Sequence, residues 1–141
     1  MKPEDKELLL QDLCGRLPYD VKISYRCNHI HILKAIHKSG LIVIDDTITN
    51  IITTTDIENI NPYLFPLSSM TEEQLYEITE LFGGEIDFSS PGVIELSTFY
   101  RNKLGCVEML AIIKWFLKNH FDIWGLIPKG LASDATELNI Y

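Results

Sequence analysis

The residues best suited to chemistry are Cys27, His29 and His31, which lie two positions apart in one short segment. Successive side chains of a β-strand project to opposite faces, so on a strand these three would share one face. A thiolate and two imidazoles are ligands that zinc and copper prefer. However, no fourth ligand is evident, and the same alternation is typical of the solvent-facing side of a half-buried strand. We therefore predict no bound metal and no cofactor, with these three residues as the candidate ligands if a metal does bind.

His120 and Asp122 are the candidate pair for acid–base catalysis. An imidazole beside a carboxylate can act as a general base, but a histidine at the C-terminal end of a helix is also favoured by the helix dipole. We interpret His120 as a helix-end or core residue. The alternative is a small enzyme that uses His120 and Asp122, or a metal held by the first three residues. The common phosphate-binding, nucleophile-elbow and metalloprotease motifs are not present in the sequence.

Three aromatic residues near the C-terminus, Trp115, Phe121 and Trp124, are the candidates for contact with a protein partner. Tryptophan is enriched among the residues that dominate binding at protein interfaces. The tail after His120 contains glycines and a proline, which predict an irregular backbone. Its apolar side chains nevertheless predict that the tail belongs to the fold and fills a groove between a long helix and the sheet; they are Phe121, Trp124, Leu126 and Ile127.

The chain has 141 residues and a formal net charge of -8, and its length is typical of a single domain, residues 1–141. Because an acidic chain repels phosphates, neither nucleic acid nor an anionic membrane is an expected partner. The N-terminus is charged where a signal peptide would be apolar, no apolar run could span a membrane, and the cysteines have no disulfide or zinc spacing. These features predict a cytoplasmic protein. A nucleic-acid-binding small barrel stays a further alternative because of a locally basic set: Lys22, Arg26, Lys34 and Lys38.

Residues 1–66 predict an N-terminal helix and a small antiparallel β-meander. The helix covers residues 4–14 and ends at Gly15. Alternating apolar residues then predict four short strands joined by tight turns, two of which fall at Cys27–Asn28 and Asp45–Asp46; the strands are 19–26, 28–39, 41–44 and 48–53. In the second strand the core-facing set is Ile30, Ile32 and Ile36, opposite His29, His31 and Leu33. Such a meander forms an SH3-like barrel or a curled sheet.

Residues 67–141 predict a mainly helical subregion with an ordered tail, which makes the fold class α+β. Pro62 and Pro66 place residues 56–66 in a connector that allows a short helical turn at 57–60. Ser69 followed by Glu72 is typical of a capping box, and predicts a helix that ends at Gly83–Gly84. Beyond it we expect irregular chain or a short hairpin at 85–98, then a long central helix at 99–119 that is covered on most sides.

Three stretches carry a resemblance to a known group of proteins: residues 17–22, 60–71 and 115–132. They resemble short proteins without an established activity that are common in gut Bacteroides genomes and their phages. The resemblance implies a cytoplasmic prophage or mobile-element context, and it supplies no catalytic residue. We therefore predict a noncatalytic protein-interaction module of phage or mobile-element origin, whose protein partner and oligomeric state the sequence leaves open.

Overall fold

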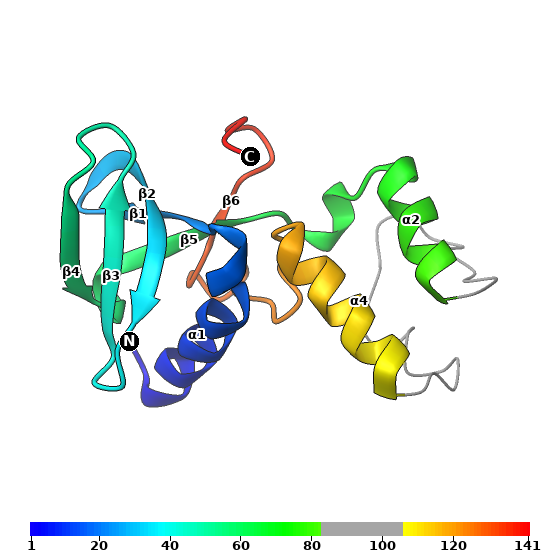
Figure 1. Cartoon of the computed structure of the whole chain (residues 1–141), viewed down its shortest axis with the longest axis horizontal. Coiled ribbons are helices and arrows are strands. Elements are labelled where there is room, and N and C mark those ends of the chain that lie inside the picture. The colour runs from blue at the N-terminus through cyan, green and yellow to red at the C-terminus, as the bar shows by residue number, and fades with distance from the viewer. Residues whose placement is uncertain (83–105) are drawn as a thin grey trace.

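The computed structural model describes residues 1–82 and 106–141 and has an α+β fold (Figure 1). Helix α1 (Pro3–Arg16) lies beside an open sheet, and the helices α2 (Glu72–Phe82) and α4 (Cys106–Lys118) lie beyond α1. The predicted fold class is confirmed, and the sheet is open rather than a closed barrel. The predictions for the helix end at 83–84, the hairpin at 85–98 and the helix start at 99–105 lie outside the described residues. Within the described ranges, no helix is long and apolar enough to cross a bilayer.

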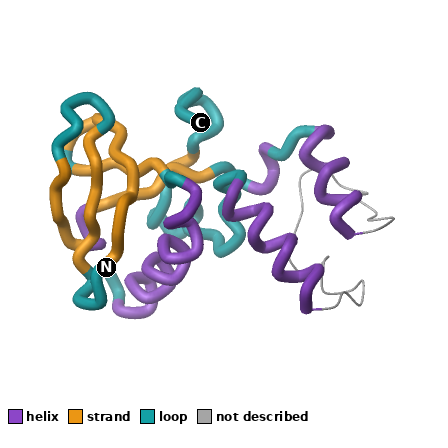
Figure 2. Tube along the Cα trace, in the orientation of Figure 1, coloured by secondary structure: helices purple, strands orange, loops and turns teal. Residues whose placement is uncertain are grey.

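The sheet has six strands in the order β4-β3-β2-β1-β5-β6 (Figure 2). The predicted antiparallel meander is formed by β1 (Lys22–Tyr25), β2 (Cys27–Ile36), β3 (Leu41–Asp46) and β4 (Ile52–Asp56). The turn between β1 and β2 lies at Arg26, whose φ is +50°, and not at Cys27–Asn28. Strand β4 begins at Ile52 rather than at residue 48, because Asp46 ends β3 and its carboxylate accepts backbone hydrogen bonds that hold the next turn.

Strand β5 (Ile60–Leu64) occupies the segment that we predicted to be a connector. It pairs antiparallel with β1 and parallel with β6 (Ser133–Asp134). Proline lacks a backbone donor and normally argues against an interior strand. Here β6 reaches only Tyr63 and Leu64, so Pro62 lies where β5 has an open edge. The helical turn predicted just before this segment is confirmed as a 3-10 turn at Ile57–Asn59.

The core-facing side of β2 is the opposite of the predicted one. His31 and Leu33 are buried, whereas Ile30 and Ile32 are only partly buried. The pairing of β2 with β3 shifts register between Leu33 and Ala35, and such a bulge changes which residues face inward. Ile36 therefore packs against the core although it has the same parity as Ile30 and Ile32.

The main core lies between α1 and the sheet. Leu9 and Leu13 of α1 join a cluster of buried strand residues that includes Ile23, Leu33, Ile42 and Ile44. Helix α1 continues through Gly15 instead of ending there. A Cβ at Gly15 would lie 3.0 Å from Cδ1 of Leu117, so a larger residue there would require the Leu117 side chain to shift where α1 packs against α4.

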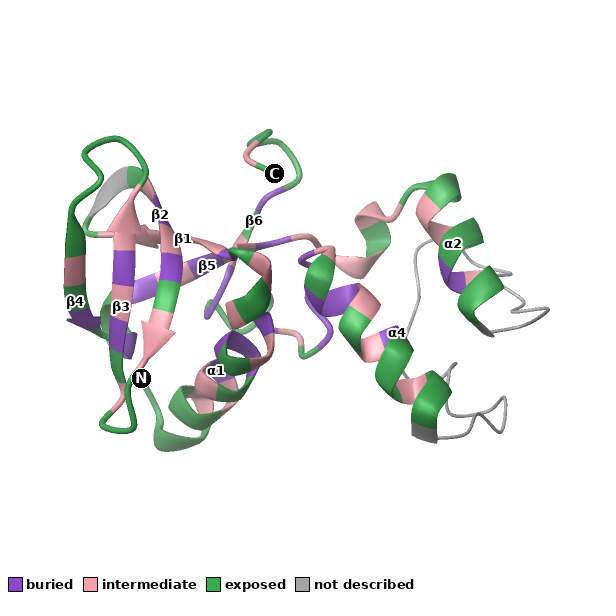
Figure 3. Ribbon diagram, in the orientation of Figure 1, coloured by how far each residue is buried: buried purple, intermediate pink, exposed green. Residues whose placement is uncertain are grey.

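A second core cluster joins α2 and α4 to the start of the tail; it contains Ile78, Ile112, Phe116, Leu117, Phe121 and Ile123. The capping box of α2 is formed by Thr71 and Gln74, each side chain accepting the backbone N–H of the other residue. Ser69, the predicted cap, instead lies in a 3-10 turn and donates to the carbonyl of Pro66. Helix α4 is not central, because Val107 and Leu110 are exposed and much of the helix is exposed in Figure 3.

Candidate functional site

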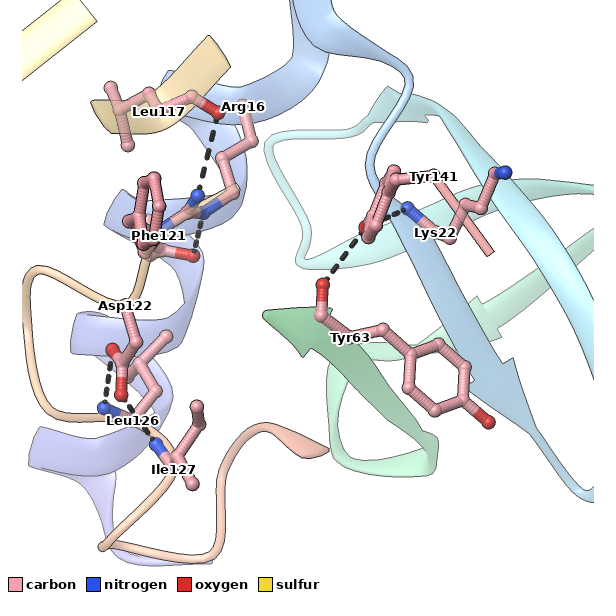
Figure 4. A network of polar contacts seen from close by, with 10 residues as sticks. Arg16, Lys22, Tyr63, Leu117, Phe121, Asp122, Leu126, Ile127 and Tyr141 are labelled. Carbon is pink, nitrogen blue, oxygen red and sulfur yellow. Dashed lines mark hydrogen bonds and ion pairs between the residues drawn. The ribbon is translucent and has the colours of Figure 1, made fainter. Parts of the chain in front are cut away.

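A buried ion pair holds the C-terminal segment against α1. Asp12 and Arg16 are one helical turn apart, and the guanidinium donates to both carboxylate oxygens at 2.7 and 2.8 Å. Arg16 also donates to the carbonyls of Phe121 at 2.7 Å and Leu117 at 3.5 Å (Figure 4). Both charged side chains are fully buried, so each depends on the other for its charge to be tolerated. We call this ion pair, together with residues 117–127, the C-terminal clasp.

The clasp gives His120 and Asp122 separate roles. The two carboxylate oxygens of Asp122 accept the backbone N–H groups of Leu126 and Ile127, each at 2.8 Å (Figure 4). The ring of His120 stacks on that of Tyr141, with 3.9 Å between centroids. Its Nδ1 is buried and has no hydrogen-bond partner among the described residues. The structure therefore does not bring the predicted catalytic pair together as a base and its orienting carboxylate.

His120 ends α4 in a conformation that usually belongs to glycine. Its φ is +60°, its N–H donates to Leu117, and the N–H of Phe121 donates to Phe116, which is the Schellman pattern of a helix C-terminus. Burial, assisted by the positive charges of Arg16 and Lys22, lowers the pKa of His120 to about 4. The imidazole is thus neutral at pH 7. The interpretation of His120 as a helix-end or core residue is confirmed, because it is buried and ends α4.

Tyr141 and His120 line a polar pocket of about 550 Å³. The hydroxyl of Tyr141 accepts the backbone N–H of Lys22 and donates to the carbonyl of Tyr63, both at 2.9 Å (Figure 4). Burial raises the pKa of Tyr141 to about 12. The described residues that line this pocket include no serine, threonine or cysteine that His120 could activate as a nucleophile. The pocket therefore offers no support for the enzyme alternative.

Two of the three candidate metal ligands, His29 and His31, lie in different environments. Nδ1 of the half-exposed His29 lies 3.8 Å from a carboxylate oxygen of Asp46. His31 is buried, and its ring meets that of Tyr25 edge-on, with 5.7 Å between centroids. The side chain of Cys27 is outside the described part. Among the described side chains, no three His, Cys, Asp or Glu residues are grouped so that they could hold a metal.

The three aromatic candidates for partner contact lie in different environments. Phe121 is buried and offers no surface to a partner. Trp115 is partly buried: its ring stacks on Phe121 and its Nε1 donates to Glu77 at 3.1 Å. Trp124 is 43% exposed. The prediction that the tail is part of the fold is confirmed for Phe121, Leu126 and Ile127, and wrong for Trp124.

The members of the predicted basic set have different neighbours. Lys34 lies near two carboxylates, 3.9 Å from Asp20 and 4.0 Å from Asp45. The charged groups of Lys22 and Arg26 lie over tyrosine rings, at 5.1 and 5.2 Å from the centroids. Of these three side chains, only Lys34 therefore faces carboxylates, whereas Lys22 and Arg26 lie over uncharged rings.

The most exposed apolar surface of the sheet lies at its β4 end. Ile48, Ile51 and Ile52 are 66%, 60% and 68% exposed, and most of β4 and the preceding turn is exposed in Figure 3. Residues 47–55 contain no charge, no proline and no glycine, and all but Asn50 are β-branched. We call residues 47–56 the β4 edge. Native proteins normally protect an edge strand with lysine, proline or a bulge, and none of these is found in β4.

The hydrogen-bond pattern identifies which backbone groups of β4 face outward. The N–H of Asp46 donates to Ile51 across the strands, and the N–H of His37 donates to Leu41 on the other side of β3. Inward and outward residues alternate along an antiparallel pair. With the register Val43↔Thr54, the bonds to β3 are therefore made by Thr53 and Thr55. The outward groups are the N–H and C=O of Ile52 and Thr54 and the N–H of Asp56, whose C=O caps the 3-10 turn at Ile57–Asn59.

No family model matches this chain, and neither a curated protein nor a solved structure is significantly similar to it.

Sequence reasoning missed both the clasp and the β4 edge. The i, i+4 spacing of Asp12 and Arg16 between buried leucines is a signal for an intrahelical ion pair, but nothing local shows that it also binds carbonyls after α4. The sequence predicts a strand at 48–53, and the β-branched, uncharged composition of 47–55 is the signal of an edge that can accept another strand.

Proposed function

We propose that this protein is a noncatalytic protein-interaction module that binds an extended segment of a partner at the β4 edge. The observation that carries the proposal is the row of outward backbone groups at Ile52, Thr54 and Asp56, flanked by exposed isoleucines. In strand addition, main-chain hydrogen bonds supply affinity and side chains on alternate positions supply specificity. The cytoplasmic setting on a phage or mobile element, which the resemblance implies, is part of the same proposal.

The backbone of the β4 edge is held in place before any partner binds, which favours strand addition. Asp46 anchors the turn before β4, since its carboxylate accepts the N–H of Ile48 at 2.8 Å and that of Thr49 at 3.3 Å. These backbone hydrogen bonds, first that from Ile48, lower the pKa of Asp46. The turn is therefore held by Asp46 and the extended part, 52–56, by its pairing with β3 before a partner arrives, which reduces the ordering that binding requires.

Site-specific photo-crosslinking in cells of the native host tests the proposal. A photoreactive residue at position 54 should form a crosslink to one protein, and the crosslinked residues should lie in an extended segment of that protein. The same group at the exposed Gln11 of α1 is the matched control and should not give this product. Thr54→Pro removes an outward N–H without removing a bond to β3, so it should abolish binding at an otherwise folded edge.

A crosslink that is no stronger at position 54 than at position 11 would overturn the proposal. So would a partner that binds Thr54→Pro as well as it binds the native chain, once circular dichroism has shown that the variant is folded.

A further inference from the structure

We infer that the β4 edge takes a second copy of this chain, with two β4 strands pairing antiparallel about Thr54. This inference rests on the proposed function, because it names the occupant of the same edge. The result is a two-fold dimer in which the two sheets become continuous.

The backbone geometry of β4 is self-complementary. In an antiparallel pair, residues that exchange both hydrogen bonds alternate with residues that exchange none. A two-fold axis at Thr54 places Thr54 opposite Thr54 of the second copy, and Ile52 opposite its Asp56. Thr54 then exchanges both hydrogen bonds with Thr54 of the second copy, and the outward N–H of Asp56 lies opposite the C=O of Ile52.

The charge distribution favours a second copy at this edge. Each chain carries a formal charge of -8, so two copies repel each other over most of their surfaces. In the register about Thr54 the paired positions are 52–56, where residues 52–55 are uncharged and Asp56 lies opposite Ile52 rather than another carboxylate. A symmetric contact sets equivalent residues against each other near the axis, so it is the kind of contact that needs an uncharged centre.

The length of the strand sets the strength of the contact. A five-residue strand buries less area than a standard stable interface, and contacts of that size are weak and reversible. We therefore expect a dimer whose population depends on protein concentration across the micromolar to millimolar range.

Charged substitutions at Thr54 test both whether a second copy binds the β4 edge and whether the two strands pair about Thr54. In sedimentation equilibrium, the native chain should show a concentration-dependent rise in average mass toward that of two copies. Thr54→Lys and Thr54→Asp should each weaken self-association at least tenfold, because like charges then meet at the axis. An equimolar mixture of the two variants should associate at least as strongly as the native chain. Gln11→Lys and Gln11→Asp, which make the same charge changes on α1, should leave association unchanged.

The outcomes separate this inference from the proposed function. A native chain that stays monomeric at millimolar concentration overturns the second copy, and a crosslink from position 54 to a different protein would still support strand addition. Variants that associate as the native chain does, or a mixture that does not recover, also overturn pairing about Thr54. Circular dichroism of each variant establishes that loss of association is not loss of folding.

Discussion

The C-terminal clasp and the β4 edge differ in whether their backbone polar groups have hydrogen-bond partners within the chain. At the clasp, Arg16 donates to two carbonyls at the end of α4, and Asp122 accepts two amides of the tail. At the β4 edge, the outward backbone groups of Ile52, Thr54 and Asp56 have no counterpart strand in the described chain. In the clasp, buried charged side chains form hydrogen bonds with backbone groups of the same chain. At the β4 edge, the outward backbone groups are free to bind another chain.

The difference shows where this fold tolerates change. Removing one member of a buried ion pair leaves the other charge unpaired in a low dielectric. An exposed edge loses nothing within the fold when its outward groups change, because water already solvates them. The clasp should therefore determine stability, and the β4 edge should determine association.

The largest effect is expected for Arg16→Met. The substitution leaves the carboxylate of Asp12 buried without its partner, and loss of one member of a buried pair costs about 3 to 5 kcal/mol. Urea unfolding should show this loss in the free energy of unfolding. The double variant Asp12→Leu, Arg16→Met removes both charges and should recover most of it. A single variant within 1 kcal/mol of the native chain would contradict the role given to the clasp.

The tail provides a matched pair of apolar residues, Leu126 and Trp124. Leu126 is fully buried between α1 and the sheet, whereas Trp124 is 43% exposed. Leu126→Ala should lower the free energy of unfolding by about 2 to 5 kcal/mol, and Trp124→Ala by less than about 1 kcal/mol. Equal losses, measured by thermal and urea unfolding, would mean that the tail packs differently from the clasp described above.

His120 makes the clasp sensitive to acid. Its pKa falls from 6.5 to about 4 on folding, so between these values the unfolded chain binds a proton that the folded chain does not. Stability from this group is complete above about pH 6.5 and is lost as the pH falls toward 4, by about 3 kcal/mol in all. His120→Asn keeps a residue that tolerates positive φ and removes the titration.

The measurement is the difference between native and variant unfolding free energies at pH 7.5 and pH 4.5. Carboxylates also titrate in this range, but they do so in both proteins and cancel in the difference. Parallel pH profiles would contradict the neutral buried imidazole.

Helices and strands with a regular spacing of apolar residues could be predicted from the sequence. Which of their faces are buried, and what packs against them, could not. Alternation gave the meander, and the leucine stripe gave α1. The core-facing side of β2 was wrong because alternation does not reveal a bulge at Leu33/Ala35. Helix α4 was predicted to be central because it is apolar on most sides, yet burial depends on what packs against it. The strand at Pro62 was missed because its pairing partners, β1 and β6, are distant in sequence.

The smallest effect on stability is expected at the β4 edge. Ile48 and Ile51 are mostly exposed, and the turn that carries them is held by Asp46 rather than by their side chains. The double variant Ile48→Thr, Ile51→Thr keeps β-branched residues and should change the free energy of unfolding by no more than about 0.5 kcal/mol. Ile44→Thr makes the same chemical change at a fully buried position of the neighbouring strand β3 and should cost about 2 kcal/mol or more, because it adds a hydroxyl to the core. Urea unfolding of both variants measures this contrast. A loss above about 1 kcal/mol from the double variant would show that the two isoleucines pack on their own fold, and the β4 edge would then not be a free surface for a second strand.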